Sequence, residues 1–309
     1  MKKVLIILLA VFITAALFAC GTVDEPDDGR ITVVTTVFPI YDWVTELTRG
    51  NADYDVILLC DNGTDMHSFQ PTAEDIIAIK ECDLFVCVGG ESEEWCEGIC
   101  DESVTLRLGD GIACDGHNHD AHNEHDSHEH TFDEHIWLSL RNAADCCTLI
   151  AERLNALKPD GAINDSLTSY VARLNELDDL YSEAADGGVF DTLVFCDRFP
   201  FYYLAKDYGL NYIAAFDGCS SECEASFETV ITLADKIDDL GIKHVLIIEG
   251  SGQSIATTVI NSCADKEIQI LAIDSMQSVK GADIENGKDF IGTMESNLEI
   301  LKSALGYGG

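Results

Sequence analysis

Histidines are concentrated in one short segment of this 309-residue chain: seven of the nine fall within residues 116–135, among Asp, Glu, Asn and Ser. Imidazole nitrogens and carboxylate oxygens are good ligands for Zn²⁺ and similar divalent transition metals. A segment in which the two alternate can bind several ions weakly and exchange them quickly. The segment has no apolar periodicity, so we expect a mobile auxiliary metal loop rather than an inert solvated linker. Its candidate ligands are His117, His119, His122, His125, His128 and His130.

The two histidines outside this segment have different settings. His67 lies just beyond the carboxyl end of a predicted strand and before a helix that Thr72 is expected to cap. Ligands of open α/β sheets bind at that edge, so His67 is a candidate metal ligand. His244 leads directly into a predicted strand and is assigned no role.

The first residues have the layout of an export signal. Two lysines precede an apolar run over residues 4–19, which is too short to indicate a membrane span. The run ends in LFAC, which resembles a bacterial lipobox whose cysteine, here Cys20, is lipidated. We therefore expect a signal peptide at 1–19, a lipid-anchored tether at 20–30 and an extracytoplasmic protein anchored to the cell membrane. The alternative is a plain signal peptide followed by an unmodified cysteine.

The net charge limits the possible binding partners, and the cysteines bear on possible disulfides and metal sites. The formal net charge of −38 argues against nucleic acid and anionic lipid and is compatible with cations. Besides Cys20 there are twelve scattered cysteines, and no Cys-x-x-Cys spacing of a zinc ribbon occurs. We expect most of them to be small buried apolar residues, with one or two disulfides possible.

Two series of short β-branched runs alternate with amphipathic helical segments. Alternation of strand and helix indicates a mostly parallel sheet covered on both faces. The fold is therefore predicted to be α/β with two lobes, 31–160 and 188–309. The predicted strands are 31–36, 54–59, 84–88, 192–195, 212–215, 245–248 and 268–273, and the predicted helices of the first lobe are 41–48 and 73–80.

A long helix is predicted between the two series. Residues 162–186 lack Gly and Pro, and their apolar residues are spaced by threes and fours. A helix of this length extends roughly 37 Å at 1.5 Å per residue. We expect the segment 161–187 to be a rigid link that limits how far the lobes swing.

Two motifs in the first lobe point to a family. DMHSFQPT at residues 65–72, followed by CDLFV at 82–86, resembles the first ligand motif of the ZnuA/TroA-like (cluster A-I) solute-binding proteins of metal-uptake ABC transporters. DEHIWLSLRNA at 133–143 resembles the next ligand motif of the same family. The resemblance implies a TroA-like fold with His67 and His135 as ligands and a carboxylate ligand at Asp274. The alternative for Asp274 is a helix cap or turn residue.

The function that the resemblance implies is capture of a divalent ion, Zn²⁺ above all, in the cleft between the lobes. The partner would be the membrane permease of an ABC importer, and the protein would act as a monomer without an enzymatic step. Mn²⁺ or iron is the alternative within the family, although histidine ligands favour zinc. A zinc hydrolase is the alternative from another class. No His-Glu-x-x-His motif, nucleophile elbow or evident general base supports it.

One position departs from the family pattern. Arg198 stands where the family places a histidine or glutamate ligand, and a guanidinium cannot coordinate a metal. Asp197 is our first candidate for the missing ligand; Cys196, a water, an acidic residue of 222–224 or a loop histidine are the alternatives. Arg198 itself is expected either to leave the shell incomplete or to support a ligand carboxylate from behind.

Overall fold

The computed structural model describes residues 29–99, 101–112, 133–216 and 225–308. The predicted signal peptide, Cys20 and all six candidate histidines of the auxiliary loop lie outside the described residues. Residues 31–309 cluster into one compact unit, and the account below concerns that unit.

The first lobe contains a four-stranded parallel sheet in the order β2-β1-β3-β4. Val33 of β1 pairs with Val56 on one side and with Leu84 on the other. Val33, Val34 and Thr35 of β1 are buried, so both faces of this strand are covered, as in a parallel sheet between helices. The elements are β1 (Ile31–Thr35), α2 (Phe38–Leu47), β2 (Tyr54–Leu58), η1 (Met66–Ser68), α3 (Ala73–Glu81), β3 (Leu84–Cys87), η2 (Glu91–Cys96), β4 (Thr105–Arg107), η3 (Leu108–Gly111), η4 (Ile136–Leu138) and α4 (Leu140–Leu157).

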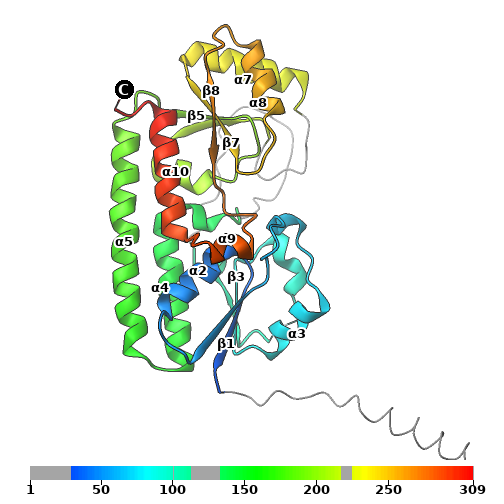
Figure 1. The fold of residues 1–309 in the computed structure, drawn as a ribbon, viewed down its shortest axis with the longest axis vertical. Helices are drawn as coiled ribbons and strands as arrows, with labels where there is room; N and C mark the ends of the chain where they lie inside the picture. Colours follow the sequence, from blue (N-terminus) through cyan, green and yellow to red (C-terminus); the bar gives the residue numbers. More distant parts are fainter. Residues whose placement is uncertain (1–28, 100, 113–132, 217–224, 309) are drawn as a thin grey trace, which may run out of the picture. The chain divides into compact units, whose positions relative to one another are not determined.

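The second lobe repeats the arrangement with strand order β6-β5-β7-β8, again all parallel. Helices α7 and α8 lie beside this sheet in Figure 1, and α10 contacts β5, β7 and β8. The elements are β5 (Thr192–Phe195), α6 (Tyr202–Asp207), β6 (Asn211–Ala214), α7 (Phe227–Leu240), β7 (His244–Ile248), α8 (Ser254–Ser262), β8 (Gln269–Ile273), α9 (Gly281–Glu285) and α10 (Phe290–Leu305).

A long helix joins the lobes, as predicted. Helix α5 spans Gly161–Asp186 and begins where the Asp160 side chain accepts the backbone N–H of Ala162. It packs against α4 and α10, and the three helices run side by side along one flank in Figure 1. The fold class predicted from the sequence, with two α/β lobes joined by a long helix, is therefore confirmed.

Several local details follow from the sequence. Thr72 caps α3 in a capping box with Asp75, which ends the loop that carries His67. The eight cysteines within the described ranges are all buried, where they pack as small apolar residues. The short strand β4 was not predicted from the sequence. Across the described residues, we find no helix with both the length and the apolar character needed to cross a membrane.

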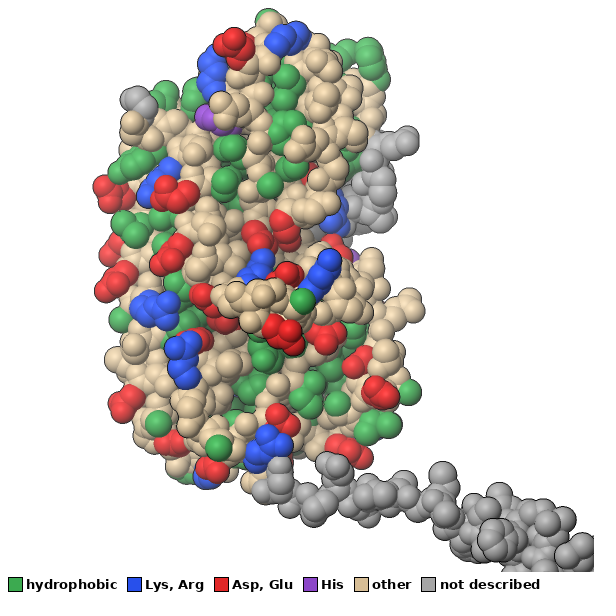
Figure 2. Space-filling view, viewed as in Figure 1, with side chains coloured by type: hydrophobic (Ala, Val, Ile, Leu, Met, Phe, Trp, Pro, Cys, Tyr) green, Lys and Arg blue, Asp and Glu red, His purple; other side chains and the backbone are tan. Residues whose placement is uncertain are grey.

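The surface carries the acidic excess of the chain. Figure 2 shows acidic side chains over both the upper and lower halves of the visible face, with fewer basic ones between them. On this face the acidic side chains are spread out rather than gathered into one patch.

Candidate metal centre

His67 lies on a tight turn after β2. Asp65 precedes the η1 turn, and its Oδ1 accepts the backbone N–H of His67 at 3.0 Å. On the ring, Nδ1 lies 2.5 Å from Ser92 Oγ and 3.6 Å from Glu134 Oε2. A hydroxyl can donate or accept, so Ser92 can support either neutral tautomer of His67.

The ring of His135 is fixed by its neighbour Asp133. The Asp133 Oδ1 atom accepts the backbone N–H of His135 at 2.9 Å and lies 2.8 Å from ring Nδ1. A carboxylate at Nδ1 favours a proton there, which leaves the lone pair on Nε2. His135 is only 4% exposed, and it directly precedes the η4 turn that leads into α4.

The two rings meet at their Nε2 atoms, which are 3.1 Å apart although the residues are 68 positions apart in the chain. Two imidazole nitrogens at about 2.0–2.1 Å from a tetrahedral zinc would stand about 3.3 Å from each other. The pair therefore already has nearly the spacing of two ligands of one ion. The structure brings together the two histidines that the sequence singled out.

Gln277 completes this group, and the sequence analysis did not identify it. It lies in the loop after β8 in the second lobe, is 4% exposed, and places Nε2 2.8 Å from His135 Nε2. An amide carbonyl is a possible metal ligand, and nitrogen and oxygen exchange places when the amide turns over. Only its position in the sequence could have indicated Gln277, because it follows the candidate ligand Asp274 by three residues in the same loop after a strand.

Asp274 lies at the same strand end but has other partners. Its Oδ1 accepts the backbone N–H of Met276 at 2.8 Å, and Oδ2 forms an ion pair with Lys288. Asp274 also lies close enough to Glu249 to affect it: burial, and then the charge of Asp274, raise the pKa of Glu249 to about 7. The cationic partner of the Asp274 side chain is thus Lys288.

Asp197 and Arg198 have structural partners. Asp197 is 8% exposed, and its two carboxylate oxygens accept the backbone N–H groups of Arg198 at 2.8 Å and Ile248 at 3.0 Å. The Arg198 guanidinium pairs with Asp65 Oδ2 at 3.1 Å, the residue whose other oxygen holds the His67 backbone. The Arg198 side chain of the second lobe therefore joins the turn of the first lobe that carries His67.

Two acidic side chains hold the backbone around Ser92, the residue whose hydroxyl lies beside the His67 ring. Glu134 Oε1 accepts the Ser92 N–H at 2.7 Å, and Glu93 accepts the Gly89 N–H at 2.7 Å. Burial raises the pKa of Glu93 to about 7. In the part of the chain that the structure describes, no three His, Cys, Asp or Glu side chains converge for a metal. The donors that converge are two imidazoles and one amide.

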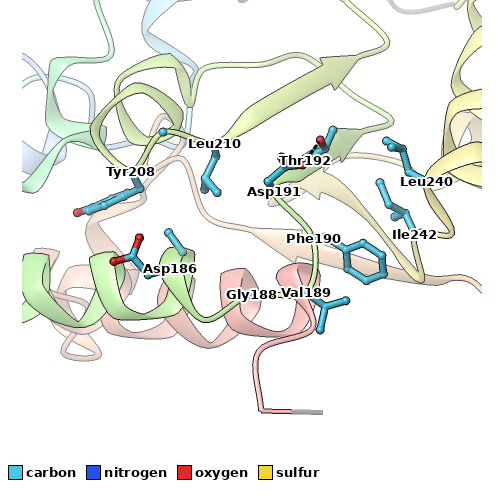
Figure 3. Close-up of a pocket in the computed structure, with 12 residues that line it drawn as sticks. Asp186, Gly188, Val189, Phe190, Asp191, Thr192, Tyr208, Leu210, Leu240 and Ile242 are labelled. Atoms are coloured by element: carbon cyan, nitrogen blue, oxygen red, sulfur yellow. Dashed lines mark hydrogen bonds between the residues drawn. The ribbon is translucent and has the colours of Figure 1, made fainter.

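A cavity of about 540 Å³ lies away from the histidine pair, in the second lobe. Figure 3 shows Val189, Phe190, Asp191 and Thr192 at the start of β5, with Leu240 and Ile242 opposite them. This is the amino end of the sheet, whereas ligands of parallel sheets bind at the carboxyl end. None of its lining residues belongs to the histidine group, so we assign it no part in metal binding.

Fold and site together define a class: a two-lobed α/β binding protein whose lobes are linked by one long helix and meet at a histidine pair. The chain belongs to the ZnuA family, described as zinc-uptake complex component A, periplasmic, whose model matches residues 33–304. The resemblance inferred from the two ligand motifs is thereby confirmed.

Curated relatives fall in the same family. The chain is 27% identical to zinc-binding protein AdcA of Streptococcus pyogenes over 302 residues, which cover 91% of this chain and 57% of that protein. It therefore spans little more than half the length of that relative. The high-affinity zinc uptake system protein ZnuA of Bacillus subtilis is also 27% identical, with 95% of this chain and 96% of that protein covered.

Solved structures agree with this grouping. The Zn(II)-bound ZnuA-like domain of Streptococcus pneumoniae AdcA aligns with a TM-score of 0.72 at 26% identity and covers 90% of this chain and 99% of that one. The metal-dependent lipoprotein YcdH of Bacillus subtilis aligns with a TM-score of 0.74 at 25% identity, covering 89% and 99%. The chain therefore shares its fold with both of these structures.

Proposed function

We propose that this chain captures Zn²⁺ between its lobes and delivers it to the membrane permease of an ABC importer. The observation that carries the proposal is the His67–His135 pair, with Nε2 atoms 3.1 Å apart and a partner on each Nδ1. The zinc-binding names of the relatives support the same cargo. Neutral imidazoles favour zinc over Mn²⁺, which prefers oxygen ligands and stays the alternative.

Asp274 is the proposed carboxylate ligand. It faces Lys288 in this structure, so coordination requires zinc to take the place of the ammonium beside Oδ2. A divalent ion attracts a carboxylate more strongly than an ammonium does at similar distance. Asp197 is the weaker candidate, because both its oxygens already accept backbone N–H groups that would lose their acceptor.

We also propose where this protein acts and in what oligomeric state. It is an extracytoplasmic monomer, anchored to the cell membrane through lipid on Cys20, and it performs no chemical step. The family description as a periplasmic component of an uptake complex and the lipoprotein name of a Streptococcus pneumoniae relative support this location. A zinc hydrolase would need a general base that the sequence motifs do not supply.

The first test removes the histidines one at a time. We expect His67→Ala and His135→Ala each to weaken tight binding of one zinc by about tenfold or more, because each removes a direct ligand. Competition titration against a chelator measures the change, and His244→Ala in β7 is the matched control. Protons compete for Nε2, so affinity should fall as the pH is lowered. Unchanged tight binding in both variants would overturn the proposed site.

The second test separates the loop from the cleft. We propose that the histidines of residues 116–130 collect zinc weakly, because a strip without packing must be ordered each time it closes around an ion. A chain that lacks these residues should bind one zinc as tightly as before and lose only the weak equivalents in isothermal titration. Loss of the tight equivalent would show that a loop histidine is a primary ligand.

A further inference from the structure

Two cysteines of the first lobe lie against each other at the ends of one short segment. Cys87 is the last residue of β3, and Cys96 is the last residue of η2. Their side chains share a hydrogen bond and belong to one buried apolar cluster. Contact between two thiols is the first requirement of a disulfide, since the S–S bond is about 2.0 Å long.

The backbone between the two cysteines brings them together. Gly89 and Gly90 have φ values of 81° and 119°, which residues with a side chain rarely adopt. The Gly89 N–H donates to Glu93 Oε2 at 2.7 Å, and the Glu93 N–H donates to the Gly90 carbonyl at 3.2 Å. The two glycines reverse the chain after β3, and η2 then returns Cys96 to Cys87. The contact therefore follows from the course of the chain.

Two other buried thiols have backbone partners instead. The Cys263 thiol donates to the Val259 carbonyl at 3.3 Å, and the Cys82 thiol donates to the Ile79 carbonyl at 3.1 Å. Both bonds lie within or at the end of a helix, where a cysteine packs as a small apolar residue. Contact of one thiol with another distinguishes the β3–η2 pair from these two cysteines.

The two sulfurs of the pair differ in reactivity. The hydrogen bond from Cys87 lowers the pKa of the Cys96 thiol; burial opposes this, and the Arg107 guanidinium adds to it. The same hydrogen bond, together with burial, raises the pKa of Cys87. Cys96 is 5% exposed, whereas Cys87 is fully buried. Because the thiolate is the attacking form, Cys96 is the sulfur that reacts first with an oxidant from outside.

We propose that Cys87 and Cys96 form a disulfide that closes the segment between β3 and the end of η2. The oxidant is a low-molecular-weight disulfide, and the reaction is thiol–disulfide exchange. The Cys96 thiolate attacks one sulfur of the oxidant and expels a first small thiolate. Cys87 then gives up its proton, attacks the Cys96 sulfur of the mixed disulfide and expels the second. Two protein thiols become one S–S bond, and the oxidant is reduced to two small thiols.

The modification goes beyond zinc capture and depends on the proposed function only for its location. Outside the cytoplasm disulfides persist, whereas cytoplasmic thiols are kept reduced. The closed segment carries Ser92, whose Oγ lies 2.5 Å from His67 Nδ1 and whose N–H donates to Glu134 at 2.7 Å. A bond across this segment restrains the unfolded chain, and restrains most a stretch that contains two glycines. We expect oxidation to raise the melting temperature by several degrees.

Peptide mapping of the full chain tests the bond itself. The metal-free protein is kept folded in excess oxidised glutathione, its free thiols are alkylated during denaturation, and it is cut with a protease that cleaves after glutamate. Glu91, Glu93 and Glu94 lie between the two cysteines, so their peptides stay together only through an S–S bond. We expect the joined pair. Alkylation of both Cys87 and Cys96, or a glutathione adduct on Cys96 beside an alkylated Cys87, overturns the proposal.

Variants test the effect on stability. Each protein is melted in its oxidised and in its reduced form, so destabilisation by the substitution itself cancels from the difference. Cys87→Ala and Cys96→Ala should each lose the rise in melting temperature that oxidation gives the wild type. Cys60→Ala, which removes another buried sulfur of the same cluster, is the matched control and should keep it. If both pair variants keep the rise, the proposal is wrong. If a variant fails to fold, the peptide map of the wild type still decides.

Failure of this proposal differs from failure of the proposed function. Tight zinc binding with both thiols free after oxidation would leave zinc capture in place and remove the disulfide. A joined peptide pair in a chain that binds no zinc tightly would do the reverse. The disulfide is read in chelator and the zinc affinity by competition titration, so neither measurement depends on the other.

Discussion

At the scale of single residues, the proposed site keeps its two histidines together although Arg198 stands where the family pattern has a ligand. The Arg198 side chain cannot coordinate a metal, but it pairs with Asp65. The second carboxylate oxygen of Asp65 accepts the backbone N–H of His67. The residue therefore acts on the ligand turn through a carboxylate. This is the supporting role that the sequence left open for it, although the carboxylate is not one of the proposed ligands.

This role predicts the behaviour of Arg198 variants. Arg198→Ala should weaken zinc binding by about threefold to tenfold, because a partly buried ion pair that restrains Asp65 is lost. Arg198→His should weaken it as well, since the imidazole does not reach Asp65 in the same way. Chelator competition measures both, with Arg173→Ala on the exposed face of α5 as the charge-matched control. Tighter binding in Arg198→His would contradict this and indicate an incomplete shell.

The sequence predicts only some of the residues that meet at the candidate site. His67 and His135 could be predicted because each lies in a recognisable motif at the edge of a sheet. Gln277 could not, because a single glutamine after a strand has no spacing that distinguishes it from a surface residue. Its place depends on the backbone of Met276 and on the contacts of Asn297 and Trp137, which only the folded chain brings together.

At the scale of elements, most strands were predicted to within a residue or two at each end, since buried β-branched runs leave a clear pattern. The exception is β4, where three residues after a turn are too few for a pattern. The sequence predicted helices in the second lobe but gave no residue bounds for them. Helix α10 matters most among them, because it packs against both α2 and α5 and so reaches the first lobe.

A buried carboxyl group where α2 meets α5 predicts that the stability of the protein depends on pH. Asp42 of α2 is 8% exposed and accepts a hydrogen bond from Tyr170 of α5 at 3.2 Å. Burial raises its pKa to about 6, with Asp289 raising it further and Arg49 opposing. The folded state therefore holds its proton more tightly than the unfolded state. Stability from this group is fully present below about pH 4 and is lost as the pH rises to about 6.

The rise of the Asp42 pKa from 3.8 to about 6 corresponds to about 3 kcal/mol of unfolding free energy. Asp42→Asn keeps an acceptor for Tyr170 and removes the charge. It should therefore raise the melting temperature of the metal-free protein by several degrees at pH 8 and leave it nearly unchanged at pH 4. Calorimetry in chelator at the two pH values provides the comparison. An equal shift at both would show that Asp42 does not carry this linkage.

At the scale of the whole described unit, the two lobes are coupled. The largest buried cluster contains Val33 of β1, Leu193 of β5 and Leu301 of α10, so the core continues from one sheet to the other. Polar contacts add to it: Gly281 N–H donates to the Asp61 carbonyl at 2.7 Å, and Trp137 reaches the Ser275 carbonyl. A continuous core favours unfolding as one cooperative unit rather than lobe by lobe.

Because the proposed ligands come from both lobes, zinc should stabilise that whole unit. The metal-free protein is expected to melt in a single calorimetric transition, and zinc at about 100 times its dissociation constant should add about 2.7 kcal/mol and raise the entire transition by several degrees. Trp137→Phe removes the donor to the buried Ser275 carbonyl, which should lower the metal-free melting temperature at a cost of about 1–3 kcal/mol. It should also reduce zinc affinity, since the loop that carries Gln277 and Asp274 is then held less firmly. Two separate transitions, of which zinc moves only one, would show that the ion binds within a single lobe.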